Sequence, residues 1–185
     1  MRKLRNVLII VCVLATGPLW WRAQDVFAEV ERERRAAALY RQGLSLHLKG
    51  QSGEAAVLFR QAIILAPLAA EVYGDLADAE FRQGHVDAAV ETYRKLQAIY
   101  PYTYFGGFYR EVGFIELRAG RNVEARDDLA RAVSLDPLDW HAQYLLGHAY
   151  KRLGDRASAR GAWRRVLDLR PDFQPAHEQI RILGN

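Results

Sequence analysis

The feature that most constrains the fold is a repeat of about 34 residues that begins near residue 36. Five kinds of residue recur in register: a small residue, a glycine, an alanine, a large side chain and a proline. The small residues and glycines are Gly43, Ala77, Gly113, Gly147 and Gly50, Gly84, Gly120, Gly154. The others are Ala55, Ala89, Ala125, Ala159, then Phe59, Tyr93, Leu129, Trp163, and finally Pro67, Pro101, Pro137, Pro171. Every column has spacings of 34, 36 and 34 residues, so the four copies are units of one architecture.

Each column has a mechanical reason in a pair of antiparallel helices. The small residue lets the helices approach, the glycine supplies left-handed backbone at the turn, and the alanine faces the first helix. The large side chain fills the gap toward the next pair, and the proline ends the second helix. The sequence therefore predicts four helix hairpins. The expected helices cover 36–49, 53–66, 70–83, 86–100, 106–119, 122–135, 140–153 and 156–170, and 175–183 would cover the end of the stack.

These five columns resemble the tetratricopeptide repeat family, over residues 36–171. The resemblance implies an all-α, right-handed α-solenoid of four repeats, 36–69, 70–105, 106–139 and 140–173, with a capping helix over 174–185. The departures are modest, for example Ala77 at a position that is usually Gly.

In this family the first helix of each pair lines a concave surface that binds a peptide or a helix of a partner. The resemblance places these residues on it: Tyr40, Leu44, His47, Asp78, Phe81, Arg82, Arg110, Phe114, Leu117, Tyr144, His148 and Lys151, with Arg41, Asp75, Glu111 and His141 beside them. Aromatic anchors among charged groups favour a binding surface. The alternative is that the apolar members pack helix against helix. A clamp for a carboxyl terminus, known in some members, is not expected, because its positions hold residues such as Tyr40, Asp75 and Glu111.

The junction between the second and third repeats carries two extra residues and many aromatic rings. The candidate contact patch there consists of Tyr102, Tyr104, Phe105 and Phe108. Such rings either contact a partner or a membrane interface, or fill the wider gap between repeats.

The N-terminal arm, residues 1–22, carries an export or membrane signal. Three basic residues precede an apolar run from Val7 to Ala15. We expect an uncleaved single-pass anchor with Trp20 and Trp21 at the membrane interface. The alternative is a signal peptide that is cleaved after Ala28, which the short apolar run and a helix break at Gly17–Pro18 would favour. Residues 23–35 are predicted to form a helical stalk.

Charge and motifs exclude several classes of function. The first 35 residues hold seven basic and four acidic residues, and the remainder, with 19 basic and 18 acidic, is almost neutral, so a nucleic-acid partner is not expected. The stripe Arg156, Arg160, Arg164, Arg165 is interpreted as a solvated face. No catalytic motif occurs, and the single Cys12 forms no disulfide or zinc site. His141 and His148 share a helix face, which is a weak metal signal.

We therefore expect a protein that is not an enzyme and that needs no cofactor, metal or small-molecule substrate. Its partner would be a protein, bound as by an assembly factor or accessory subunit of a membrane or exported complex. The expected place is the bacterial inner membrane, with the N-terminus in the cytoplasm and the repeats in the periplasm. The alternative is a cleaved, soluble periplasmic adaptor or chaperone, for example in cytochrome c maturation or envelope secretion.

Overall fold

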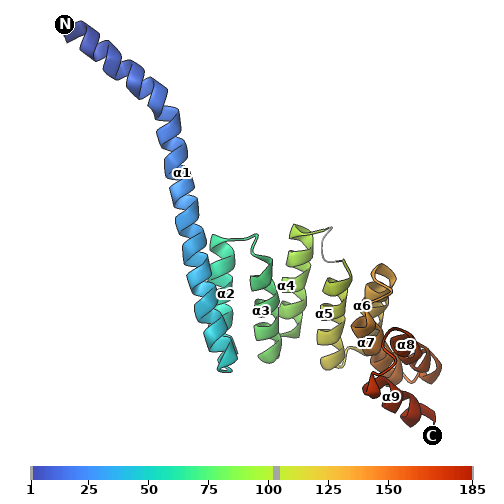
Figure 1. The fold of residues 1–185 in the computed structure, drawn as a ribbon. Coiled ribbons are helices and arrows are strands. Elements are labelled where there is room, and N and C mark those ends of the chain that lie inside the picture. The colour runs from blue at the N-terminus through green and yellow to red at the C-terminus, as the bar shows by residue number, and fades with distance from the viewer. Residues whose placement is uncertain (1, 102–104, 185) are drawn as a thin grey trace. The chain divides into compact units, whose positions relative to one another are not determined.

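The computed structural model describes residues 2–101 and 105–184, with the side chains of residues 24–101 and 106–184. This described part is entirely helical and contains nine helices (Figure 1). They are α1 (Arg2–Leu48), α2 (Ser52–Leu65), α3 (Ala70–Arg82), α4 (Val86–Ile99), α5 (Phe105–Arg118), α6 (Asn122–Leu135), α7 (Trp140–Arg152), α8 (Arg156–Leu169) and α9 (Gln174–Gly184). The predicted helices are confirmed to within one residue at every boundary except the start of the first helix.

Helix α1 differs from the prediction in its length. It is one helix of 47 residues that covers the segments predicted as anchor, stalk and first repeat helix. The helix break expected at Gly17–Pro18 in the alternative with a cleaved signal is absent, because α1 continues through both residues. From residue 23 onward the chain is rich in Ala, Glu and Arg, which are strong helix formers, and no glycine or proline interrupts it before Gly43.

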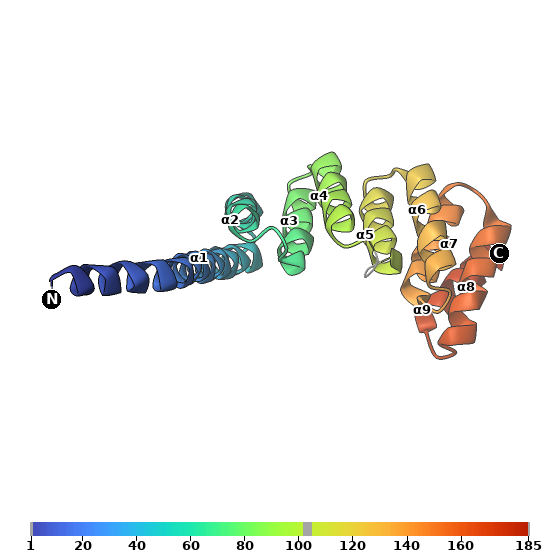
Figure 2. The ribbon, with the colours of Figure 1, turned by 90° about the horizontal axis from the view of Figure 1, so that it is seen from above.

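The chain divides into two compact units, residues 1–72 and 73–185. In the first unit, α1 packs along α2. In the second unit, α5 packs on α6, α6 on α7, α7 on α8, and α8 on α9, so each element covers the next (Figure 2). This order is expected for hairpins that cannot bury their apolar faces alone.

The glycine column makes the turn within every hairpin. Gly50, Gly84, Gly120 and Gly154 have φ angles of 81°, 81°, 80° and 82°, where a side chain would be strained. The next residue donates its backbone N–H to a carbonyl in the last turn of the first helix: for example, Arg121 N bonds Glu116 O at 2.9 Å and Asp155 N bonds Tyr150 O at 3.0 Å. These hydrogen bonds satisfy carbonyl groups that have no partner within the helix, because they lie in its last turn.

The column of small residues sets the distance between the two helices of a hairpin. A Cβ atom on Gly43 would lie 2.7 Å from Cε1 of Phe59, and one on Gly113 would lie 2.5 Å from Cγ of Leu129. On Gly147 it would lie 2.6 Å from Cδ1 of Trp163. The large residue of the second helix therefore occupies the space that the missing side chain leaves, and Phe59, Leu129 and Trp163 are completely buried.

The core of the second unit is a series of clusters at the helix interfaces. One joins Ala77, Ala89 and Val90 to Tyr109, Val112 and Ile115. The next joins Leu117 and Leu129 to Leu146 and Ala149, and the last joins Trp163 and Val166 to Ala176 and Leu183 of α9. Helix α9 thus covers the apolar side of α8, which is the position expected of a capping helix.

Candidate partner-binding surfaces

The face of the second unit that the sequence predicts for binding is formed by α3, α5 and α7. Phe81 of α3 and Phe114 of α5 are half-buried, with ring centroids 6.5 Å apart at an angle of 59°. Both rings also pack on the core cluster of Tyr109 and Val112. The two rings link α3 to α5. Much of their surface is therefore used in packing one helix against the other, which is the alternative given for these residues in the sequence analysis.

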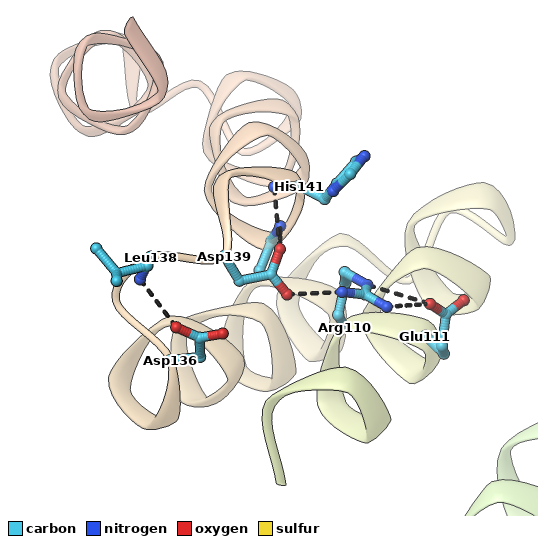
Figure 3. Close-up of polar contacts among 7 residues, drawn as sticks. Arg110, Glu111, Asp136, Leu138, Asp139 and His141 are labelled. Carbon is cyan, nitrogen blue, oxygen red and sulfur yellow. Dashed lines mark hydrogen bonds and ion pairs between the residues drawn. The ribbon is translucent and has the colours of Figure 1, made fainter. Parts of the chain in front are cut away.

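A network of ion pairs connects α5 with the start of α7 (Figure 3). Arg110 donates through Nη1 to Oδ2 of Asp139 at 2.8 Å, and through Nη2 to Oε1 of Glu111 at 2.9 Å. The same two carboxylates raise the pKa of Arg110 against the opposing effect of its burial. Asp139 is buried and caps α7, since its Oδ1 accepts the backbone N–H groups of His141 and Ala142, each at 3.0 Å. The cap thus fixes Arg110 in one orientation.

Tyr144 and His148 of α7 form the C-terminal part of this face, and His148 packs on the buried ring of Trp163 from α8. His148 contacts Tyr144 edge-on with centroids 4.7 Å apart and Trp163 at 5.3 Å. Burial lowers the pKa of His148, and nearby Lys151 and Arg152 lower it further, so the imidazole is neutral at pH 7. Lys151 donates to Gln179 of α9 at 2.8 Å. Tyr144 and His148 are half-buried and present polar atoms on a rigid apolar base.

Three of the residues predicted to face a partner have buried side chains. Leu117 is 4% exposed and belongs to the cluster around Leu129, and Phe108 is 7% exposed and packs on Tyr109 with centroids 4.9 Å apart. His47 is 7% exposed beside the ring of Phe59. This burial agrees with the alternative that Leu117 and Phe108 pack inside the helix stack, and contact of the three residues with a partner stays a prediction. Each of them packs against a large side chain of the neighbouring helix: Leu117 against Leu129, His47 against Phe59, and Phe108 against Tyr93 of α4 with ring centroids 6.3 Å apart.

The remaining predicted positions vary in exposure. Tyr40 and Leu44 are half-buried on α1, and the ring of Tyr40 lies 5.8 Å from that of Phe59. Arg82 is exposed and paired with Asp78 at 2.8 Å, one turn earlier on α3. Such exposed pairs contribute little stability. Tyr102, Tyr104 and the side chain of Phe105 lie outside the described residues.

The sequence analysis missed a groove in the first unit, which we call the stalk groove. It has a volume of about 460 Å³, is partly open to solvent, and lies between α1, the end of α2 and the start of α3. Helix α1 contributes Glu29, Arg32, Glu33, Ala36, Ala37 and Tyr40. The end of α2 and the following segment contribute Ala62, Leu65, Ala66, Pro67, Leu68 and Ala69, and α3 contributes Glu71 and Val72. The only signal in the sequence was the helix-forming stalk immediately before the first repeat.

A second feature that the sequence did not indicate is a carboxyl pair inside the third hairpin. Glu116 of α5 is 5% exposed and its Oε2 has no hydrogen-bond partner among the described residues, while Asp128 of α6 is half-buried. Burial raises the pKa of Glu116 to about 7, with contributions from Asp128 and Glu124, against the opposing effect of Arg121 and Arg94. Burial also raises the pKa of Asp128. Glu116 therefore keeps its proton in weakly acidic solution.

The basic stripe on α8 is only partly a solvated face. Arg156 and Arg160 donate to the carbonyl of Leu183 at the end of α9, at 3.0 and 3.3 Å. Arg164 and Arg165 are exposed, as predicted. Half of the stripe thus holds the capping helix against α8 by bonding an otherwise unpaired helix-end carbonyl.

The described residues contain no group of three or more His, Cys, Asp or Glu side chains arranged to hold a metal ion. His141 stacks on Trp140 with centroids 3.5 Å apart, whereas His148 contacts Tyr144 and Trp163. The two histidines thus contact different rings.

The predicted anchor lies mostly outside the part of the chain whose side chains are described. This applies to Trp20 and Trp21, for which the structure gives only the backbone course of α1. None of the helices, as far as their residues are described, has an apolar stretch long enough to cross a membrane.

The described architecture is that of a protein built from repeated helix hairpins. Comparison with known families shows which repeat family this is. The model of the tetratricopeptide repeat matches residues 49–103 and 115–172, and this chain belongs to that family. Members of the family are, in general, modules that bind other proteins. A comparison with curated protein sequences gives no match.

Several solved structures are similar in fold. MamA from Desulfovibrio magneticus has a TM-score of 0.70 at 20% identity, covering 81% of this chain and 84% of that one. The pilF protein of Pseudomonas aeruginosa has a TM-score of 0.67 at 22% identity, covering 83% and 69%. A tetratricopeptide repeat protein from Parabacteroides merdae has a TM-score of 0.71 at 18% identity, covering 81% and 59%. At these identities the similarity concerns the fold.

Proposed function

We propose that this protein is a non-enzymatic scaffold, anchored in a membrane by residues 1–22, whose repeats bind a segment of a partner polypeptide. In this proposal it is an assembly factor or accessory subunit of a membrane or exported complex. The anchor would lie in the bacterial inner membrane, with the N-terminus in the cytoplasm and the repeats in the periplasm. The support for the anchor is the basic start and apolar run of the sequence.

The observation that carries the binding function is the fixed arrangement of side chains on α3, α5 and α7. Phe81 and Phe114 contact each other, Arg110 is held by two carboxylates, and Tyr144 lies edge-on to His148. All of these side chains are only half-buried. Aromatic and arginine side chains that are already ordered lose little conformational entropy when a partner binds. This face is therefore preorganised for binding a polypeptide.

The test is photo-crosslinking of the full chain in its native membrane. A photoreactive amino acid replaces Arg82 or His141, which are exposed on α3 and α7, and the control positions are Glu91 and Arg164, exposed on α4 and α8. The membranes are then solubilised in detergent, and mass spectrometry measures the intact mass and identifies crosslinked proteins. We expect an uncleaved chain crosslinked to one membrane or exported partner from the first two positions.

Three results would oppose this proposal in different ways. Equal crosslinking from the control positions would contradict binding on α3, α5 and α7. A mass lacking the first 28 residues, with soluble partners, would favour a free periplasmic adaptor over an anchored one. The absence of any crosslinked protein would contradict the scaffold function.

A further inference from the structure

The stalk groove exists because α1 begins long before the first repeat. Helices α3, α5 and α7 begin at Ala70, Phe105 and Trp140, immediately after the preceding junction. Helix α1 instead continues N-terminally past the junction between α2 and α3, so that Glu29, Arg32 and Glu33 form a wall beside it. The groove is therefore a property of the stalk and the first hairpin together. In the described part of the later repeats, the first helix begins at the junction and forms no such wall.

The rim of the stalk groove has an excess of negative charge. Glu29, Glu33 and Glu71 line it, with Arg32 as the one basic residue. Among the described residues, these four side chains form no ion pair. The stalk ion pair that does occur joins Glu31 to Arg35 at 3.1 Å, and neither residue lines the groove. A phosphate or carboxylate ligand would thus meet like charges, whereas a cationic ligand would meet unpaired carboxylates.

The floor of the groove is apolar and made largely of small side chains. Ala36, Ala37, Ala62 and Ala66 contribute methyl groups, and Leu65 adds a larger apolar surface. Small side chains allow the backbone of another helix to approach closely, as Gly43, Gly113 and Gly147 do within the hairpins of this protein. The floor therefore suits a helix with apolar side chains.

Apolar surface continues beyond the groove along α1, and an exposed leucine lies at its opposite edge. Val26 and Val30 are 58% and 40% exposed and lie on the same side of α1 as Glu33 and Ala37, by their helical spacing. Leu68, at the other edge, is 70% exposed. These exposed side chains lengthen the apolar surface of the alanine floor. A helix bound there would therefore have apolar contacts along several turns.

We propose that the stalk groove binds an amphipathic, basic helical segment of the partner polypeptide. Its apolar side chains would lie on the alanine floor, and its Lys or Arg side chains would pair with Glu29, Glu33 and Glu71. This inference rests on the proposed scaffold function and deepens it, because it specifies the chemistry of a bound segment and a site separate from α5 and α7.

The experiment selects peptides from a random displayed library on the immobilised full-length chain in mild detergent. The selected peptides are synthesised with a fluorophore, and their affinity is measured by fluorescence anisotropy. One variant carries Glu29→Gln with Glu33→Gln, and its control carries Glu91→Gln with Glu178→Gln, two exposed carboxylates of the second unit. A second variant, Ala37→Phe, fills the groove, and Ala98→Phe on the exposed side of α4 is its control.

We expect peptides rich in Lys or Arg and in Leu or Ile, with affinities that fall as the salt concentration rises. Loss of the two rim carboxylates should weaken binding about three- to ten-fold, since each exposed pair contributes modestly. The Ala37→Phe variant should weaken it at least as much, while both controls should bind as the unmodified protein does.

The other outcomes are distinguishable. Peptides that bind both groove variants unchanged would overturn the groove assignment and leave the scaffold function standing. Selection of acidic peptides, or self-association that is lost in the groove variants, would overturn the basic partner segment. A chain that selects no peptide and crosslinks no protein would overturn both proposals.

Discussion

The third and fourth hairpins, α5–α6 and α7–α8, share one backbone geometry but differ in what they bury. In each, a glycine of the first helix lies under a completely buried large residue, Gly113 under Leu129 and Gly147 under Trp163. In each, a glycine with φ near 80° makes the turn. The columns of the repeat therefore fix the backbone irrespective of which large residue fills the gap.

Between the columns the two hairpins diverge. The third holds the carboxyl pair Glu116 and Asp128, where the fourth has Tyr150 and Ala162 at the same repeat positions. Both carboxyl groups have a raised pKa, because the helix interface excludes water from them. The difference teaches that repeat positions outside the five columns are free to carry titratable groups, at a cost in stability. Four measurements test this comparison.

The largest effect is expected from a side chain added to the fourth hairpin. Gly147→Ala would place a methyl group against the rigid ring of Trp163 and disturb the bond from its Nε1 to the carbonyl of Tyr144, 3.1 Å long. We expect a loss of about 3 kcal/mol in the free energy of unfolding. Urea unfolding followed by circular dichroism measures it.

A compensating variant sharpens the same test. The second hairpin combines Ala77 with Tyr93 in these two columns, so Gly147→Ala with Trp163→Tyr should recover part of the lost stability. A double variant that is less stable than Gly147→Ala alone would contradict the explanation.

The second effect concerns pH and the third hairpin. The native pKa of Glu116, about 7, lies above the ordinary 4.5, so the folded state holds a proton that the unfolded state loses. Stability should therefore fall as the pH rises from about 4.5 to 7. Glu116→Gln should flatten this decline and stabilise the protein by about 2 kcal/mol at pH 8. Thermal unfolding of Glu116→Gln and of the exposed control Glu91→Gln between pH 4 and 8 checks it; parallel curves would refute the buried acid.

A third, smaller effect separates the caps of α7 and α8. Asp139 is buried, accepts two backbone N–H groups and pairs with Arg110, whereas Asp155 is exposed and accepts the N–H of Ser158 at 3.0 Å. Asp139→Ala should cost about 1–2 kcal/mol, and Asp155→Ala should cost less. Equal midpoints of urea unfolding for the two variants would show that the ion pair between Asp139 and Arg110 contributes nothing to the stability of the protein.

The smallest effect should come from the arginines that hold α9. Arg156→Ala with Arg160→Ala removes two bonds to the carbonyl of Leu183 and should increase amide exchange in α9 without unfolding the hairpins. The matched control is Arg164→Ala with Arg165→Ala, which leaves those bonds intact. Hydrogen exchange with mass spectrometry measures both, and equal protection of α9 would exclude this role for the stripe.

The sequence predicted the repeats well because their signals are local. A glycine at a left-handed turn, a proline after a helix and a 3.6-residue apolar period act on neighbouring residues, so eight helices were predicted almost to the residue. The start of α1 was the exception. No breaker separates the stalk from the repeat, so the helix is continuous and its function as a groove wall has no motif of its own.

The resemblance also predicted that Arg110, Phe114 and Tyr144 share one face, since a repeat register determines which side of each helix a residue occupies. It did not determine how deep each residue lies. Leu117 and Phe108 are buried, Glu116 retains a proton, and Glu29 and Glu33 border a groove because of helices that contact them from other parts of the chain. Periodicity along one helix gives a direction, whereas burial, pKa and cavities depend on the side chains that the neighbouring helices bring against it.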